Sequence, residues 1–185
     1  SNQLGEVAPE LEALLAALNR DTKAEVALAI VPGIGEDTPR EFATALFKHW
    51  GIGRREHDNG LLVLHVLDQR RVEIETGYGL EAVLTDVECS WLINDVAIPL
   101  FRAGKIAEGH AAMLRGIDHG IRHPEATREE LLAATGREGV PLSATGASEG
   151  GSSQSEAPEF GDYLERVGPW LILAALFAVL AAGVR

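Results

Sequence analysis

Apolar residues recur along the first part of the chain with two different spacings. The segment LGEVAPELEALLAALNR has its leucines at the three- and four-residue spacing of a helix, whereas AEVALAIV (24–31) is a short apolar run ended by Pro32-Gly33, which predicts a strand. The run LLVLHVL (61–67) is apolar on both faces and predicts a central strand covered on each side. After a short turn, RRVEIETG alternates polar and apolar positions and predicts a hairpin partner.

Capping signals mark the starts of further helices. Thr38, Thr85 and Thr127 each precede a glutamate by three residues, the spacing of a capping box. We expect the second of these helices to be interrupted at Pro99 and to be followed by a helix over about 105–121. The order of elements predicts an α/β layered domain with a small mixed sheet over residues 4–135.

The composition changes beyond residue 135. Residues 136–161 are rich in Gly, Ser, Ala and Glu, which predicts a flexible linker. Residues 167–184 are apolar and uncharged, so the segment 167–185 predicts one transmembrane helix; the alternative is a helix buried in a core. Asp162 and Glu165 before this segment and Arg185 after it favour a globular domain outside the cytoplasm.

Charge and cysteine content narrow the classes of partner. The 185 residues carry a net charge of -12 without a Lys or Arg cluster, which argues against nucleic acid as a partner and is compatible with cations. Cys89 is the single cysteine, so the chain forms no internal disulfide, and we expect a buried thiol there.

Two acidic loops are the candidate site. If the strands over 61–67 and 70–77 are antiparallel neighbours, the segment HDNG before the first strand lies beside GYGLEAVLTD after the second. Asp58, Asn59, Glu81 and Asp86 would then converge, with nearby glycine carbonyls, as an oxygen-rich site for Ca2+. We expect the Gly-Tyr-Gly turn to fold back on these carboxylates, with Tyr78 covering them.

The same four residues also have structural interpretations. Asp58-Asn59-Gly60 is compatible with an ordinary turn, Asp86 with a helix-capping role and Glu81 with a plain surface position. Arg71, Glu73 and Glu75 share one face of their strand, and we expect cross-strand ion pairs there rather than a ligand role. His119 and His123 have helical spacing but lack an evident third ligand, which disfavours a zinc site.

Three stretches resemble a known family: WGIG, DNGLLVLHVLDQRRVEIETGYGLEAVLTD and IPLFRAGKIAEG. In their order and spacing, over about residues 8–122, they are similar to the TPM domain. The resemblance implies a three-layer α/β/α sandwich, a membrane-anchored extracytoplasmic location and divalent-cation binding, often of calcium. Acid phosphatase activity has been proposed for plant members of that family.

These expectations lead to one principal function and two alternatives. The principal one is a single-pass, membrane-anchored, extracytoplasmic module that binds a divalent cation and acts as an accessory to membrane or envelope proteins. A metal-dependent acid phosphatase is the alternative, for which Arg71 and Arg102 are the available cationic groups. The third is an interaction domain without a ligand. The sequence assigns no catalytic residue.

Overall fold

The computed structural model describes residues 3–136. They contain a three-stranded mixed sheet with β1 (Glu25–Val31), β2 (Gly60–Val66) and β3 (Arg71–Thr76) in the order β1-β2-β3. β1 runs parallel to β2, and β3 runs antiparallel to it. β2 is therefore the central strand, and every one of its residues is buried, as its apolar pattern predicts.

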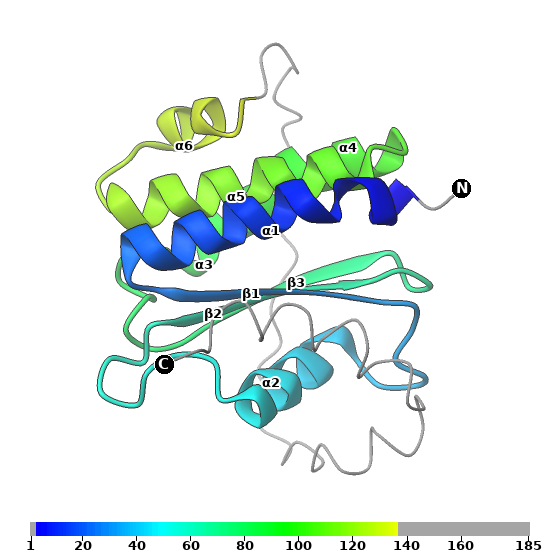
Figure 1. Ribbon diagram of the computed structural model, residues 1–185, viewed down its shortest axis with the longest axis horizontal. Coiled ribbons are helices and arrows are strands. Elements are labelled where there is room, and N and C mark those ends of the chain that lie inside the picture. The colour runs from blue at the N-terminus through cyan, green and yellow to red at the C-terminus, as the bar shows by residue number, and fades with distance from the viewer. Residues whose placement is uncertain (1–2, 137–185) are drawn as a thin grey trace.

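Helices cover both faces of this sheet (Figure 1). α2 (Pro39–Trp50) lies against one face, and α1 (Gln3–Thr22) and α5 (Ile106–Arg122) lie over the other. Alternate residues of β2 belong to two separate cores: Leu62 packs with Phe42 of α2, whereas Leu61 packs with Ile117 of α5. The result is a mixed α/β domain in three layers, in agreement with the predicted fold class.

Several short elements complete the helical layer that contains α1 and α5. α3 (Asp86–Trp91) continues as a π-helix, η1 (Leu92–Ala97), and then as α4 (Ile98–Arg102); α6 (Arg128–Ala134) follows α5. The interruption predicted at Pro99 takes another form. The chain leaves the α-helical pattern at Leu92, and Pro99 lies in the first turn of α4, where its missing N–H costs little.

The predicted caps are present at all three helix starts. In the boxes at Thr85 and Thr127 the threonine hydroxyl accepts from the glutamate N–H, and the glutamate carboxylate accepts from the threonine N–H. Thr38 also caps its helix by accepting from the N–H of Glu41, but the Glu41 carboxylate accepts from the Thr38 hydroxyl instead, at 2.7 Å. The sequence signal thus identified each helix start correctly.

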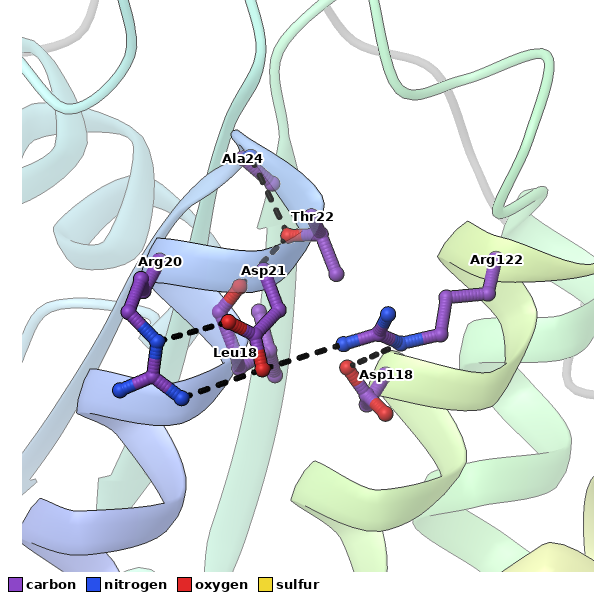
Figure 2. A network of polar contacts seen from close by, with 7 residues as sticks. All are labelled: Leu18, Arg20, Asp21, Thr22, Ala24, Asp118 and Arg122. Atoms are coloured by element: carbon purple, nitrogen blue, oxygen red, sulfur yellow. Dashed lines mark hydrogen bonds and ion pairs between the residues drawn. The ribbon is translucent and has the colours of Figure 1, made fainter.

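The C-terminal end of α1 is joined to α5 by a chain of polar contacts (Figure 2). Asp21 lies between Arg20, at 2.7 Å, and Arg122 of α5, at 3.8 Å, and Arg122 also contacts Asp118 at 2.9 Å. The Thr22 hydroxyl donates to the carbonyl of Leu18 at 2.8 Å and so satisfies a carbonyl in the last turn. Exposed ion pairs of this kind stabilise by at most about 1 kcal/mol each, so apolar packing between the helices dominates.

Two predicted segments lie outside the described residues, namely the linker over 136–161, except Gly136, and the transmembrane helix over 167–185. Within residues 3–136, none of the helices combines the length and the apolar character needed to cross a bilayer.

Candidate functional site

The two acidic loops meet at one end of the sheet, as predicted. β2 begins at Gly60 and β3 ends at Thr76, and the antiparallel register pairs Leu61 with Thr76. β1 also begins here, because Glu25 pairs with Gly60 and its N–H donates to the carbonyl of Asn59 at 2.9 Å. The loop before β2 is therefore held between the start of β1 and the end of β3.

The Gly-Tyr-Gly turn packs directly on the backbone of the loop before β2. The N–H of Gly77 donates to the carbonyl of Gly60 at 2.8 Å, and the N–H of Gly79 donates to that of Asp58 at 3.0 Å. A Cβ at Gly77 would collide with the Asp58 carbonyl, and one at Gly79 with the His57 carbonyl. Neither glycine is among those with positive φ. Close approach of two backbones, not an unusual conformation, explains both glycines.

Asp58 is exposed and sits at a strained position. Its φ is 44°, in the left-handed region that aspartate tolerates better than most residues. The carbonyl of Arg54 accepts from the N–H groups of His57 and Asp58, at 2.9 and 2.8 Å, and forms the turn that precedes it. The carboxylate of Asp58 is thereby presented to solvent beside the glycine turn.

The side chain of Asn59 holds its loop in place through two hydrogen bonds to backbone groups. Its Oδ1 accepts from the N–H of Arg54 at 2.9 Å, and its Nδ2 donates to the carbonyl of Lys23 at 2.5 Å. An amide oxygen has two lone pairs, so Oδ1 retains one for a further partner. The role visible in the structure is to tie the end of α1 to the loop before β2.

Tyr78 does not cover the carboxylates. Its side chain is 80% exposed, so the expectation that it would close over the site is wrong. The reason is local: both flanking glycines lie on the loop before β2, and the tyrosine between them is directed away from the backbone contact. Tyr78 and Val87, at the start of α3, are the exposed large apolar side chains of the described residues.

Glu81 and Asp86 are also exposed, and Asp86 lies in the first turn of α3 next to the Thr85 cap. The charge of Asp86 acts on two neighbours. It adds to burial in raising the pKa of the half-buried Glu75, and it adds to burial in raising the pKa of the Cys89 thiol to about 12. Cys89 therefore stays protonated and buried at neutral pH, as expected from the sequence.

Glu75 points toward α2 and not along the sheet. Burial is the largest cause of its raised pKa; a hydrogen bond from the Thr44 hydroxyl, at 3.1 Å, and the charges of Arg40 and Lys48 oppose it. The pKa of Glu73 is raised by burial in the same way, against the charges of Arg71 and Arg40. The cations that act on Glu75 thus come from α2, whereas Glu73 is affected first by Arg71 of its own strand and then by Arg40 of α2.

The donor chemistry of this sheet end suits a hard cation, but the carboxylates are not gathered into a ligand set. Carboxylate and carbonyl oxygens are the ligands that calcium prefers, and they lie here on loops. Among residues 3–136, however, no three His, Cys, Asp or Glu side chains lie close enough to hold one metal ion. A cation would have to draw exposed side chains such as Glu81 and Asp86 toward Asp58 by changes of rotamer.

Comparison with known proteins identifies the family. The TPM domain family matches residues 5–119, which is more than half of the chain. The chain belongs to the TPM domain family. No curated protein matches it.

Two solved structures resemble this TPM domain. The N-terminal domain of a protein from P. gingivalis is 34% identical, with a TM-score of 0.51, over 77% of this chain and 82% of that one. The BA42 protein from the psychrophilic bacterium Bizionia argentinensis has a TM-score of 0.58 over 64% of this chain and 81% of that one. Its identity is 14%, so that likeness concerns the fold alone.

The cations considered for phosphate binding lie away from the acidic loops of the TPM domain. Arg71 begins β3, whereas the loops adjoin its other end. Arg102 follows Phe101, which stacks on His65 near the far end of β2. Arg40 and Lys48, which act on Glu75, were missed because sequence periodicity does not reveal which cations of an amphipathic helix meet a neighbouring strand.

Proposed function

We propose that this TPM domain is a calcium-binding accessory module, anchored to a membrane by residues 167–185 and acting outside the cytoplasm on membrane or envelope proteins. The observation that carries the cation proposal is the pair of backbone hydrogen bonds that join the glycine turn to the loop before β2. They hold the backbone of the Asp58 loop against that of the loop containing Glu81. Asp86 begins the helix that follows.

Calcium is favoured over magnesium by the nature of the loops. Calcium accepts six to eight oxygen ligands at variable distances, whereas magnesium requires a compact octahedron. In the proposed site Asp58, Glu81 and Asp86 supply carboxylates, and Asn59 supplies the free lone pair of its Oδ1. The cation would also relieve the repulsion between Asp86 and Glu75, which contributes to the raised pKa of Glu75.

The test is thermal unfolding of the chain with and without calcium. A ligand that binds only the folded state stabilises it by about 2.7 kcal/mol at a hundredfold excess over Kd, a rise in Tm on the order of 8 °C for a domain of this size. We expect Asp58→Asn and Asp86→Asn to abolish this rise. Glu129→Gln is the matched control, since Glu129 is an exposed carboxylate in the first turn of another capped helix. An unchanged Tm at millimolar calcium, or a full rise in Tm in a variant that carries both Asp58→Asn and Asp86→Asn, contradicts the proposal.

A metal-dependent acid phosphatase is the second candidate. It is supported by the proximity of Arg40 and Lys48 to Glu75, which itself neighbours Asp86, because phosphoryl transfer requires cations near the developing charge. The discriminating measurement is hydrolysis of a generic phosphoester with added calcium or magnesium. Turnover that disappears in both Asp86→Asn and Arg40→Gln would favour this candidate over a module that binds a cation without chemistry.

The membrane proposal rests on the apolar, uncharged segment 167–184. The intact chain is expected to remain in the membrane fraction at high salt and to require detergent for extraction. A chain ending before Val167 is expected in the aqueous fraction. Recovery of the intact chain in the aqueous fraction would contradict the anchor, and co-purification from detergent extracts would identify the partner.

A further inference from the structure

Two histidines are buried between the sheet and the helices, away from the acidic loops. His65 of β2 and His110 of α5 are 4% and 0% exposed. His65 Nδ1 lies 3.0 Å from His110 Nε2, so the rings share a hydrogen bond across the boundary between sheet and helix. The Phe101 ring of α4 stacks on His65, with centroids 4.6 Å apart, and is 4.9 Å from His110. Three rings therefore join β2, α4 and α5.

The hydrogen bond leaves one nitrogen of the pair unsatisfied. In two neutral imidazoles this contact requires that only one of the two facing nitrogens carries a proton, so the tautomer of one ring fixes that of the other. His110 Nδ1 is buried and has no hydrogen-bond partner among the described residues. A further proton would place a positive charge in this buried site. Burial lowers the pKa of His65, and burial together with the charge of His65 lowers the pKa of His110 to about 3.

The elements around the pair present no carboxylate to compensate such a charge, as far as the described residues extend. β1 and β3 place Ile30 and Val72 beside His65. Glu73 lies on the opposite face of the sheet, toward α2. The other charged residues of the adjoining segments are either exposed or paired with one another. The exposed ones are Arg71 of β3 and Arg102 of α4, and the pairs are Lys105 with Glu108, Asp95 with Arg128, and Glu10 with Arg115.

The cover over the pair is short. α4 consists of residues Ile98–Arg102 and is followed by Gly104, whose φ is +77°. Phe101 is only half-buried and packs on Gly109, where a Cβ would collide with its ring. Displacing this one segment would give both imidazoles access to water while the sheet and α2 remain in place.

We propose that His65 and His110 form an acid-sensitive latch that holds α4 and the first turns of α5 on the sheet, and that proton uptake by the pair releases this part of the domain. In the closed form, with α4 and the first turns of α5 on the sheet, the two histidines bind protons more weakly than in the open form, where water reaches both rings. The open population is therefore lowest above the ordinary histidine pKa of 6.5 and grows as the pH falls below it. For His110 alone the open population at pH 5 rises by about 30-fold, and His65 acts in the same direction.

Hydrogen exchange of the full chain at pH 7.5, 6.0 and 5.0 tests the latch, with rates corrected for intrinsic exchange. Amides of α5 over 106–114 are expected to lose about 30-fold or more of their protection at pH 5. Amides of α2, which lies on the other face of the sheet, serve as the internal reference and should keep theirs. Equal losses in α2 and α5, or no loss in either, would overturn the proposal without any variant being made.

Variants then assign the effect to the pair. His65→Phe with His110→Phe removes both titrating rings while retaining aromatic packing, and should leave the protection of 106–114 independent of pH between 7.5 and 5. The control is His119→Gln with His123→Gln, a half-buried histidine in the last turn of α5 and the exposed residue that follows this helix, with ring centroids 4.7 Å apart. It should respond as the wild type does. If the control loses the pH response, or if the folded double Phe variant keeps it, the latch is assigned to the wrong histidines.

Discussion

Replacing Gly79 with alanine tests the contact between the two acidic loops. Because Gly79 does not have a positive φ, alanine there should stabilise the protein by about 0.4–1 kcal/mol if space were available. The structure predicts the opposite sign, since the new methyl group would collide with the carbonyl of His57, a backbone atom that cannot rotate aside. The sign of the change in the free energy of unfolding therefore decides the question.

The magnitude follows from two costs. Moving the turn breaks the hydrogen bond from Gly79 to the carbonyl of Asp58, which contributes about 0.5–1.5 kcal/mol. The forced displacement costs about 1–3 kcal/mol more, as for overpacking elsewhere. After the unfolded-state gain of about 0.4–1 kcal/mol is subtracted, a loss of about 0.5–4 kcal/mol remains, and Tm should fall by about 2–12 °C.

Urea unfolding followed by far-UV circular dichroism measures this loss, with the m-value checked for constancy. Gly35→Ala is the comparison, because its Cβ would meet nothing within 4 Å and only its φ of +70° opposes the change. Gly79→Ala should also weaken the calcium-dependent rise in Tm, whereas Gly35→Ala should not. A Gly79→Ala protein as stable as the wild type, or more stable, would show that the two loops are not in contact.

Two further predictions concern a cap and a buried carboxylate. Thr85→Ala should lower the free energy of unfolding by more than Thr127→Ala, for which about 1 kcal/mol is expected. The reason is that Glu88 is only 8% exposed and would lose the hydrogen bond from the Thr85 hydroxyl, keeping only the one from the backbone N–H; urea midpoints compare the two variants. Glu75→Gln should raise the free energy of unfolding at pH 7, and this gain should vanish as the pH falls below about 4.5. The reason is that burial raises the pKa of this carboxyl, so that the folded state binds its proton more tightly than the unfolded state does. The free energy of unfolding measured from pH 7 to pH 4 checks the sign.

The sequence predicted local structure well because the signals are local. A threonine followed by a glutamate three residues later marks the helix starts at Thr38, Thr85 and Thr127. The almost wholly apolar β2 can bury both of its faces only as a central strand. The π-helix before Pro99 was not foreseen. The π-helical form of η1 depends on how this segment packs on α5, and the spacing of apolar residues within 92–97 does not reveal that packing.

The candidate site was predicted in its placement but not in its contents. An antiparallel hairpin brings the start of β2 to the end of β3, so the meeting of the loops followed from strand order alone. The direction of Tyr78 and the contact of Glu75 with Thr44 depend on tertiary packing. The His65–His110 contact joins residues 45 apart, and no local pattern announces it.

The packing of α1 against α5 has a consequence for how the chain acquires its structure during synthesis. Leu11 and Leu18 of α1 are buried in a core that also contains Met113 and Ile117 of α5. These partners are translated about 100 residues after α1, a delay of about 5–20 s at ordinary elongation rates. Throughout that interval the apolar stripe of the first helix lacks its helical partner, although Val26 of β1 and Leu61 of β2, which belong to the same core, emerge earlier. The nascent chain is therefore a natural client for a holding chaperone until α5 has emerged.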